Sequence, residues 1–167
     1  MKRIVGRTLA AAVALTLGAR AAAAQDGGIA VVADAPSARV VTLEGKAVDL
    51  ADYYDGKPVV LEFWATWCPL CRKLEPAMEA ARQRHSDAVH FVSVGVTANQ
   101  TPERQREYVA KQHLTGEFVY DADGTAVKAF SAPHTSYIVV IDAKRRVVYT
   151  GVGSDQDVEA ALKKAGI

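Results

Sequence analysis

The sequence is poor in cysteine: its two cysteines, Cys68 and Cys71, are separated by only two residues. A structural zinc site needs four ligands, and neither a second cysteine pair nor a grouped set of histidines is present to complete one. Excess positive charge is also missing, because the formal net charge is +1, which argues against a nucleic acid partner. The apolar stretch over residues 8–18 is too short to span a bilayer comfortably.

The first 24 residues have the anatomy of a secretory signal peptide. Basic residues precede the apolar stretch, and three alanines at positions 22–24 supply a small-residue cleavage site. We expect cleavage after Ala24, a linker over residues 25–37 and one domain over residues 38–167. The mature protein is then expected in the periplasm or secreted, as a soluble monomer. An uncleaved signal would instead anchor the chain to the membrane.

The cysteine pair lies where a strand pattern changes into a helix pattern. Apolar, β-favouring residues over 59–64 predict a strand, and apolar residues three or four apart over 71–84 predict a helix. Cys68 is expected at the helix N-terminus, where unpaired N–H groups and the helix dipole favour a thiolate. Pro69 suits the first helical position because it has no N–H to donate. Cys71 is expected to be less exposed and to resolve a mixed disulfide formed by Cys68. A plain structural disulfide is the alternative, although so short a loop constrains the unfolded chain little.

The rest of the chain alternates between strand and helix patterns. Ser154 is the predicted N-cap of the last helix and Thr101 that of the second. This order predicts an α/β fold with a central mixed sheet flanked by helices. The predicted strands are 40–43, 47–50, 59–64, 89–96, 136–141 and 147–152, and the predicted helices are 69–85, 102–112, 125–130 and 155–165.

Glu62 is a carboxylate in the otherwise apolar strand over 59–64. Burial raises the pKa of a carboxyl group, so Glu62 could take the proton of Cys71 as a general base. The alternative is a strand-edge glutamate whose carboxylate reaches water. A nearby carboxylate also disfavours a thiolate, and Leu70 places no charge between the cysteines. The pair is therefore expected to act as a reductant or intermediate exchanger.

The run FWATWCPLCR, residues 63–72, resembles the active-site sequence of the thioredoxin superfamily, specifically of TlpA/ResA-like extracytoplasmic thiol-disulfide oxidoreductases. The resemblance extends from about Val40 to the C-terminus through the segments GKPVVL, FVSVGVT and APHTSYIVVID. It implies a thioredoxin-like fold with an N-terminal hairpin and an extra helix over 102–112. It further implies protein disulfide substrates, a membrane thiol-disulfide electron donor and no cofactor.

The resemblance also implies site residues. Thioredoxins carry a buried carboxylate at the position of Glu62, and a cis-proline opens the strand facing the cysteines, for which Pro133 is the counterpart. The spacing from Pro133 to Asp142 is longer than in the family, so the register of that strand stays open. The implied substrate-binding residues are Trp67, Pro69, Leu70, Ala132 and Pro133.

Copper carriage is the alternative function. Sco-type copper chaperones share the fold and bind copper through two cysteines and a histidine that precedes an aspartate by eight residues, a spacing that His134 and Asp142 reproduce. Thiolates and imidazole are suitable copper ligands, so the alternative set is Cys68, Cys71 and His134. Sco-type cysteines are separated by three residues, however, and here by two. A peroxidase is weaker still, because Ala65 replaces the Thr or Ser that peroxiredoxins need.

Overall fold

The computed structural model describes residues 27–167, so the predicted signal peptide and the first residues of the predicted linker lie outside the described part. A seven-stranded sheet has the strand order β2-β1-β5-β4-β3-β6-β7. The strands are β1 (Arg39–Thr42), β2 (Ala47–Asp49), β3 (Val59–Trp64), β4 (His90–Gly95), β5 (Glu117–Tyr120), β6 (Tyr137–Ile141) and β7 (Val147–Val152). The helices are α1 (Pro69–His85), α2 (Pro102–Gln112), α3 (Thr125–Ala129) and α4 (Val158–Lys163), with a 3₁₀ turn, η1, at Leu50–Tyr53.

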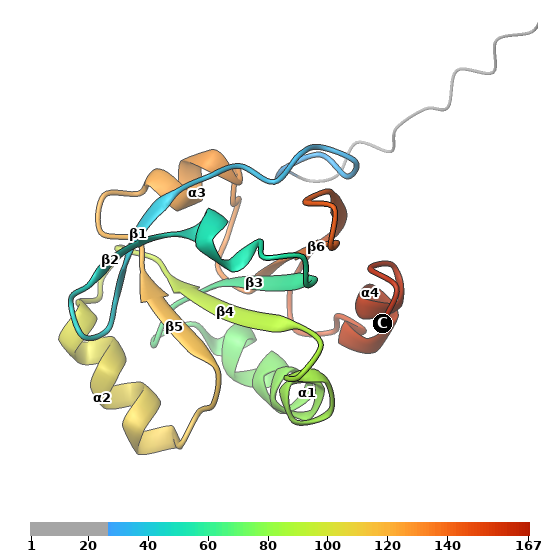
Figure 1. Cartoon of the computed structure of the whole chain (residues 1–167). Helices are drawn as coiled ribbons and strands as arrows, with labels where there is room; N and C mark the ends of the chain where they lie inside the picture. Colours follow the sequence, from blue (N-terminus) through green and yellow to red (C-terminus); the bar gives the residue numbers. More distant parts are fainter. Residues whose placement is uncertain (1–26) are drawn as a thin grey trace, which may run out of the picture.

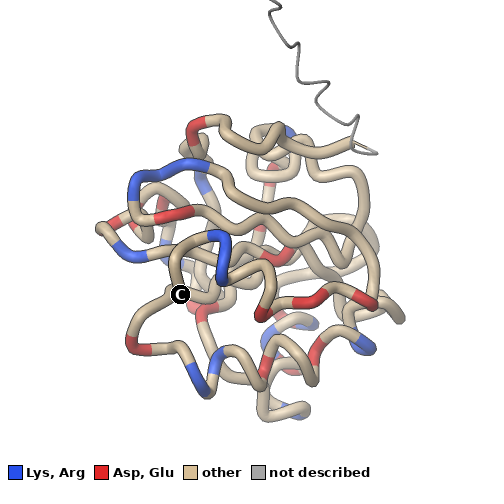
Figure 2. Tube along the Cα trace, turned by 90° about the vertical axis from the view of Figure 1, so that its right-hand side faces the viewer, with Lys and Arg blue, Asp and Glu red and all other residues tan. Residues whose placement is uncertain are grey.

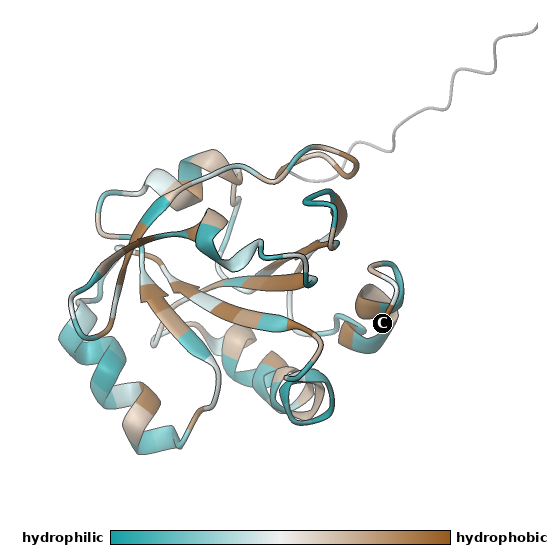
Figure 3. Cartoon of the chain, in the orientation of Figure 1, coloured by the Kyte–Doolittle hydropathy of each residue, from teal (hydrophilic) through white to brown (hydrophobic). Residues whose placement is uncertain are grey.

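Helices cover both faces of the sheet: α1 and α4 lie on one side and α3 on the other (Figure 1). The central strand β3 is buried at every position, and successive side chains of a strand point to opposite faces. Leu61 accordingly packs with the α3 side of the core, and Val60 packs with α1 and α4. The same alternation turns Glu62 and Trp64 toward α1. Apolar residues are concentrated on the strands, whereas α2 is largely hydrophilic (Figure 3).

The predicted α/β fold with a mixed sheet is confirmed. The strand β3 pairs in parallel with β4 and antiparallel with β6, and β1 and β2 form the expected N-terminal hairpin. The bounds of β3, α1, α2 and β7 are as predicted. Thr101 caps α2, since its side chain accepts the N–H of Arg104. The dithiol therefore follows the central strand of the sheet.

Among the strands and α-helices, two differ from the prediction by more than one residue at an end. The strand β5 was not predicted. Its backbone hydrogen bonds are made to two neighbouring strands: β5 pairs in parallel with β4 and antiparallel with β1. The last helix begins at Val158, not at residue 155, and its cap is Asp157, not Ser154. The side chain of Gln156 explains this shorter helix: its Nε2 donates to the carbonyls of Ser136 and Gly153, which holds the preceding segment outside the helix.

The expectation of a cis-proline at Pro133 was wrong, because residues 27–167 contain no cis peptide bond. The strand β6 begins at Tyr137, one residue later than the predicted start at Ser136. The chain enters β6 through Ser136, which is buried and has a positive φ of 61°. The carbonyl of Ser136 accepts the N–H of Gly153 at 3.0 Å, which extends the pairing of β6 with β7.

The described part of the predicted linker 25–37 is bonded to the domain. The N–H of Val32 donates to the carbonyl of Val147 at 2.8 Å, and the N–H of Val147 donates to the carbonyl of Ala33 at 2.9 Å. Further along, the N–H of Ala35 donates to the carbonyl of Arg145. This segment thus lies along the start of β7.

Basic and acidic residues are interspersed along the chain of the domain (Figure 2). This mixed distribution agrees with the net charge of +1, and a concentrated basic face is what a nucleic acid partner would require. Within residues 27–167, none of the helices has the length and apolar character needed to cross a membrane.

Candidate active site

Cys68 and Cys71 form a disulfide at the N-terminus of α1, with their Cα atoms 5.4 Å apart. Cys68 is the N-cap residue, and its Sγ accepts the backbone N–H of Cys71 at 3.0 Å. Pro69 occupies the first turn, as expected. An N–H donor and the positive end of a helix both stabilise a thiolate more than a thiol. The site therefore favours Cys68 as the nucleophile.

The exposure of the two cysteines differs from the prediction. Cys68 is 1% exposed and Cys71 is 4% exposed, so Cys71 is not the more buried of the two. Both sulfurs belong to an apolar cluster with Trp64, against which Tyr108 of α2 packs. The extra helix thus packs against the cluster that contains the pair. Cys71 lines a small cavity with Tyr108 and Glu75.

Trp67 and Leu70 are the large apolar residues exposed beside the cysteines, each with 40% exposure. The indole Nε1 of Trp67 donates to the carbonyl of Ala98 at 2.7 Å, which fixes the ring over the loop that follows β4. Pro69 is exposed between the two cysteines. These three residues form the outer surface of the site.

Gln100 is a site residue that the sequence analysis missed. It is buried, its Oε1 accepts the N–H of Thr66 at 2.9 Å, and its Nε2 donates to the carbonyl of Val96 at 2.6 Å. The hydroxyl of Tyr120 in turn donates to the carbonyl of Gln100 at 3.0 Å. Gln100 belongs to no recognisable motif, and a polar residue in a loop is ordinarily exposed. No signal in the sequence could have found it.

Glu62 is 2% exposed, so the alternative of a strand-edge glutamate that reaches water is excluded. The pKa of Glu62 is raised from 4.5 to about 8: burial raises it most, the carboxylate of Glu75 adds to the rise, and the guanidinium of Arg82 lowers it. The Oε2 of Glu62 is 3.9 Å from Nη2 of Arg82, while its Oε1 has no hydrogen-bond partner among the described residues. Burial outweighs this long ion pair, which gives Glu62 the proton affinity of a general base near neutral pH.

A groove of about 510 Å³ adjoins the exposed indole of Trp67. Ala132 and His134 line it from the segment before β6, and Val96 and Val127 provide apolar walls. The structure therefore brings Trp67 and Ala132 together, as predicted for a substrate surface. Pro133 lies between two lining residues and packs against Gly27, whereas Pro69 and Leu70 lie outside the groove lining.

The Redoxin family matches residues 12–165. The chain belongs to this family. Thioredoxin-like protein YneN of Bacillus subtilis is 32% identical to this Redoxin family member over 131 residues, which cover 77% of this chain and 76% of that protein. Thiol-disulfide oxidoreductase ResA of Bacillus thuringiensis is 29% identical over 133 residues, which cover 78% of this chain and 76% of that protein.

A solved structure supports the same relationship. A secreted Mycobacterium tuberculosis disulfide oxidoreductase, described as homologous to DsbE of E. coli, has a TM-score of 0.64 and 25% identity, over 77% of this chain and 95% of that protein. The thioredoxin-like fold and the resemblance to ResA-like oxidoreductases are confirmed. Thiol-disulfide exchange is the enzymatic chemistry that these relatives and the Cys68–Cys71 pair have in common.

The copper alternative requires Cys68, Cys71 and His134 to converge. Across residues 27–167, the structure contains no group of three or more His, Cys, Asp or Glu side chains placed to hold a metal ion. His134 faces the groove beside Trp67, and the two cysteines are bonded to each other. No observation in the described residues favours copper carriage over exchange.

Proposed function

We propose that this Redoxin family member reduces disulfides in proteins outside the cytoplasm through its Cys68-Pro69-Leu70-Cys71 motif. The observation that carries the proposal is the position of Cys68 as the N-cap of α1, with its Sγ accepting the N–H of Cys71. A sulfur held at this point is stabilised as the attacking and leaving thiolate.

The reaction proceeds in two exchanges. The Cys68 thiolate attacks one sulfur of a substrate disulfide, and the other substrate sulfur leaves as a thiolate. Glu62 then takes the proton of Cys71, and the Cys71 thiolate attacks Cys68 Sγ. The second substrate thiolate leaves, and the enzyme holds the Cys68–Cys71 disulfide. Two electrons have passed to the substrate, so a thiol donor has to reduce the pair before the next turnover.

The direction of electron flow follows from the charges around the pair. Strong oxidants of this fold stabilise the reduced, thiolate form. Here Leu70 is uncharged, and Glu75 lines the same small cavity as Cys71, where its carboxylate disfavours a second negative charge. The pair therefore serves as a reductant. In an oxidising compartment it needs a partner to keep it reduced, and a membrane thiol-disulfide protein is the donor that we propose.

The groove beside Trp67 is the proposed substrate surface. Its walls are apolar, with His134 and Thr135 adding polar groups, a composition suited to an extended segment that carries an apolar residue next to its cysteine. Trp67 and Ala132 line this groove, and Pro133 lies between the lining residues Ala132 and His134. Pro69 and Leu70, which are exposed, follow Trp67 and Cys68 in the chain. A substrate seated there would bring its disulfide toward Cys68, the residue after Trp67.

Trapping of mixed disulfides tests the proposed function. Cys71→Ala removes the thiol that releases the substrate, so partners should accumulate bound to Cys68 when the full chain is expressed in its native cell envelope. Mass spectrometry of the trapped complexes would identify substrates and the electron donor. Cys68→Ala is the matched control, because it removes the other sulfur of the same pair.

The outcomes separate the possibilities. The double variant Cys68→Ala with Cys71→Ala should trap nothing. Equal trapping by Cys68→Ala alone would reverse the assigned roles of the two cysteines. Absence of trapped proteins with Cys71→Ala, when this variant is folded and exported, would contradict the function of a protein disulfide reductase.

N-terminal sequencing tests the proposed location. The exported protein should begin near Gln25, and recovery of the intact chain from the cytoplasm would contradict the proposed location.

A further inference from the structure

We propose that Arg82 is a positioning residue for the exchange reaction, whose guanidinium holds Glu62 ready to take the proton of Cys71. This inference rests on the proposed function, because it assumes that Glu62 is the base for Cys71. Neither the family resemblance nor the sequence pattern singled out Arg82.

Arg82 is a charged residue in the protein interior, with only 3% exposure. Its Nη1 donates to Oε1 of Glu75 at 2.5 Å, and its Nη2 donates to Oγ of Ser93 at 3.3 Å. The guanidinium carbon also lies 6.0 Å from the ring centre of Phe118. Burying a guanidinium is costly unless partners compensate it. Here partners from α1, β4 and β5 hold it in one place.

The guanidinium approaches Glu62 without neutralising it. Nη2 of Arg82 is 3.9 Å from Oε2 of Glu62, too long for a hydrogen bond, whereas Glu75 takes the short contact. The neighbours of Glu62 in the sheet are the uncharged Ser93 of β4 and Ile138 of β6. The charged groups of the described residues that act on Glu62 are therefore Arg82 and Glu75, both from α1. Burial and Glu75 raise the pKa of Glu62, and Arg82 is the group that lowers it.

The helix α1 connects this cluster to the resolving cysteine. Cys71, Glu75 and Arg82 follow one another at intervals of four and seven residues, which places them along one face of the helix. Glu75 both accepts from Arg82 and lines the small cavity into which Cys71 faces. Removal of the charge of Arg82 would therefore affect Glu62 directly. It would also affect the surroundings of Cys71, because Glu75 contacts Arg82 and lines the cavity beside Cys71.

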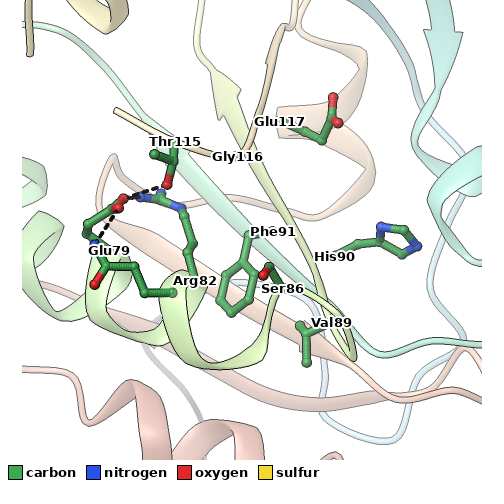
Figure 4. A pocket seen from close by; sticks show the side chains of 10 residues that line it. Glu79, Arg82, Ser86, Val89, His90, Phe91, Thr115, Gly116 and Glu117 are labelled. Atoms are coloured by element: carbon green, nitrogen blue, oxygen red, sulfur yellow. Dashed lines mark hydrogen bonds and ion pairs between the residues drawn. The ribbon is translucent and has the colours of Figure 1, made fainter. Parts of the chain in front are cut away.

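Arg82 also connects the cluster to solvent. It lines an open pocket of about 400 Å³ together with Glu79, Thr115 and Gly116 (Figure 4). In this pocket Nη1 of Arg82 is 3.4 Å from Oε2 of Glu79, which accepts the hydroxyl of Thr115 at 2.8 Å. Each turnover leaves a proton on Glu62 that has to return to water. The pocket that Arg82 lines is open to solvent and so offers this proton a way out.

The test isolates the step in which Cys71 attacks. Reduced protein is mixed with dithiobis-nitrobenzoate, a symmetrical dye disulfide: its first coloured thiolate leaves when Cys68 attacks, and its second leaves when Cys71 closes the disulfide. The rate of the second release should rise with pH as Glu62 loses its proton. Arg82→Gln should move the midpoint of this rise upward by roughly one pH unit or more, because an opposite charge within about 4–6 Å lowers a carboxyl pKa by about 1–3 units.

Matched variants separate positioning from structure. Arg84 is on the same helix but is 57% exposed and pairs with Glu159, so Arg84→Gln should leave the midpoint unchanged. In a Glu62→Gln background, Arg82→Gln should produce no further shift. A merely structural role of Arg82 would lower the unfolding temperature and the rate at every pH, with the midpoint unmoved, and this outcome would overturn the inference.

Glu75→Gln provides a second, independent variant that decides the question if Arg82→Gln fails to fold. Because the carboxylate of Glu75 raises the pKa of Glu62, this variant should move the midpoint downward, and an unmoved midpoint would overturn the inference. An unchanged profile in Glu62→Gln itself would refute Glu62 as the base and the inference with it. A changed Glu62→Gln profile with an unmoved midpoint in Arg82→Gln would refute only the role of Arg82.

Discussion

The backbone N–H of Thr66 donates to the side-chain Oε1 of Gln100 at 2.9 Å, which ties the loop before Cys68 to the loop after β4. The same amide side chain donates to the carbonyl of Val96. One buried glutamine thus satisfies two main-chain groups that come from different parts of the sequence. It holds Trp67 and Cys68 in a fixed position relative to the groove.

Replacement of Gln100 by leucine should destabilise the domain. The change removes the partner of the buried N–H of Thr66 and of the carbonyl of the half-buried Val96, at about 1–3 kcal/mol for each group that is left without one. We expect the free energy of unfolding in urea to fall by roughly 2–4 kcal/mol on this basis. Gln112→Leu is the control, because Gln112 is exposed at the end of α2. Equal stability of the two variants would contradict the role of Gln100.

Glu62 should make the stability of the domain fall as pH rises. Folding raises the pKa of this carboxyl from 4.5 to about 8, so between these pH values the folded chain holds a proton that the unfolded chain has lost. The contribution of Glu62 to stability is complete below about pH 4.5 and is lost as pH rises toward 8, at up to roughly 1.4 kcal/mol per pH unit.

Urea unfolding of the oxidised protein at pH 5 and pH 8 measures this effect. Glu62→Gln cannot ionise, so its stability should change less between the two pH values than that of the unmodified chain. Glu44→Gln, on the exposed hairpin loop, should behave like the unmodified chain. An equal pH dependence in Glu62→Gln would mean that Glu62 is ionised in the folded protein at pH 5.

The sequence predicted the elements that carry the dithiol because their signals are local. An unbroken run of apolar, β-favouring residues defines β3, and regular apolar spacing with a proline in the first turn defines α1. The position of Cys68 at the helix N-terminus follows from the junction of these two patterns. The family resemblance added the buried carboxylate at Glu62.

The features that the sequence did not predict depend on tertiary contacts. The burial of both cysteines depends on an apolar cluster to which distant residues contribute, including Tyr108 of α2 and Phe118 of β5. The start of β6 at Tyr137 is set by pairing with β7 and by the turn at Ser136, not by Pro133. The roles of Gln100 and Arg82 come from neighbours distant in sequence. A periodicity or a motif contains no information on such neighbours.

Removal of residues 27–36 should destabilise the domain, because this segment is hydrogen-bonded to β7 and its approach. Three backbone hydrogen bonds are lost with Val32, Ala33 and Ala35, and the N–H of Ile29 no longer donates to the hydroxyl of Tyr137. At about 1 kcal/mol for each bond, reduced by the entropy of ordering the segment, we expect a loss of roughly 2 kcal/mol.

Thermal unfolding of two chains, one starting at Gly27 and one at Ser37, measures this contribution. A loss of this size should lower the unfolding temperature of the shorter chain by roughly 5 °C. Gly28→Ala in the longer chain should lower it too, because Gly28 has a positive φ of 103° and an added Cβ would meet the hydroxyl of Tyr137. Equal unfolding temperatures for the two chains would show that residues 27–36 act only as a linker.

His134→Ala should leave disulfide exchange largely intact, because His134 lines the groove and contributes to no step of the proposed reaction. The rate of dye release by Cys68 and Cys71 should therefore remain within about two-fold of that of the unmodified chain, the range of an ordinary surface substitution. If the protein carries copper, His134→Ala should instead impair its function. Imidazole would complete a three-ligand site with the two thiolates, and its removal would weaken Cu(I) binding strongly.

Titration of the reduced protein with Cu(I) against a competing chelator distinguishes the two functions. We expect the unmodified chain and His134→Ala to bind Cu(I) with the same affinity, no tighter than that of an ordinary exposed dithiol without a third ligand. Cys71→Ala should abolish this binding in both backgrounds, because a single thiolate is left. Tight one-to-one binding that collapses in His134→Ala would reverse the order of the two candidate functions. It would also mean that the segment before β6 moves toward the cysteines when the disulfide is reduced, since in the described structure His134 belongs to the groove beside Trp67.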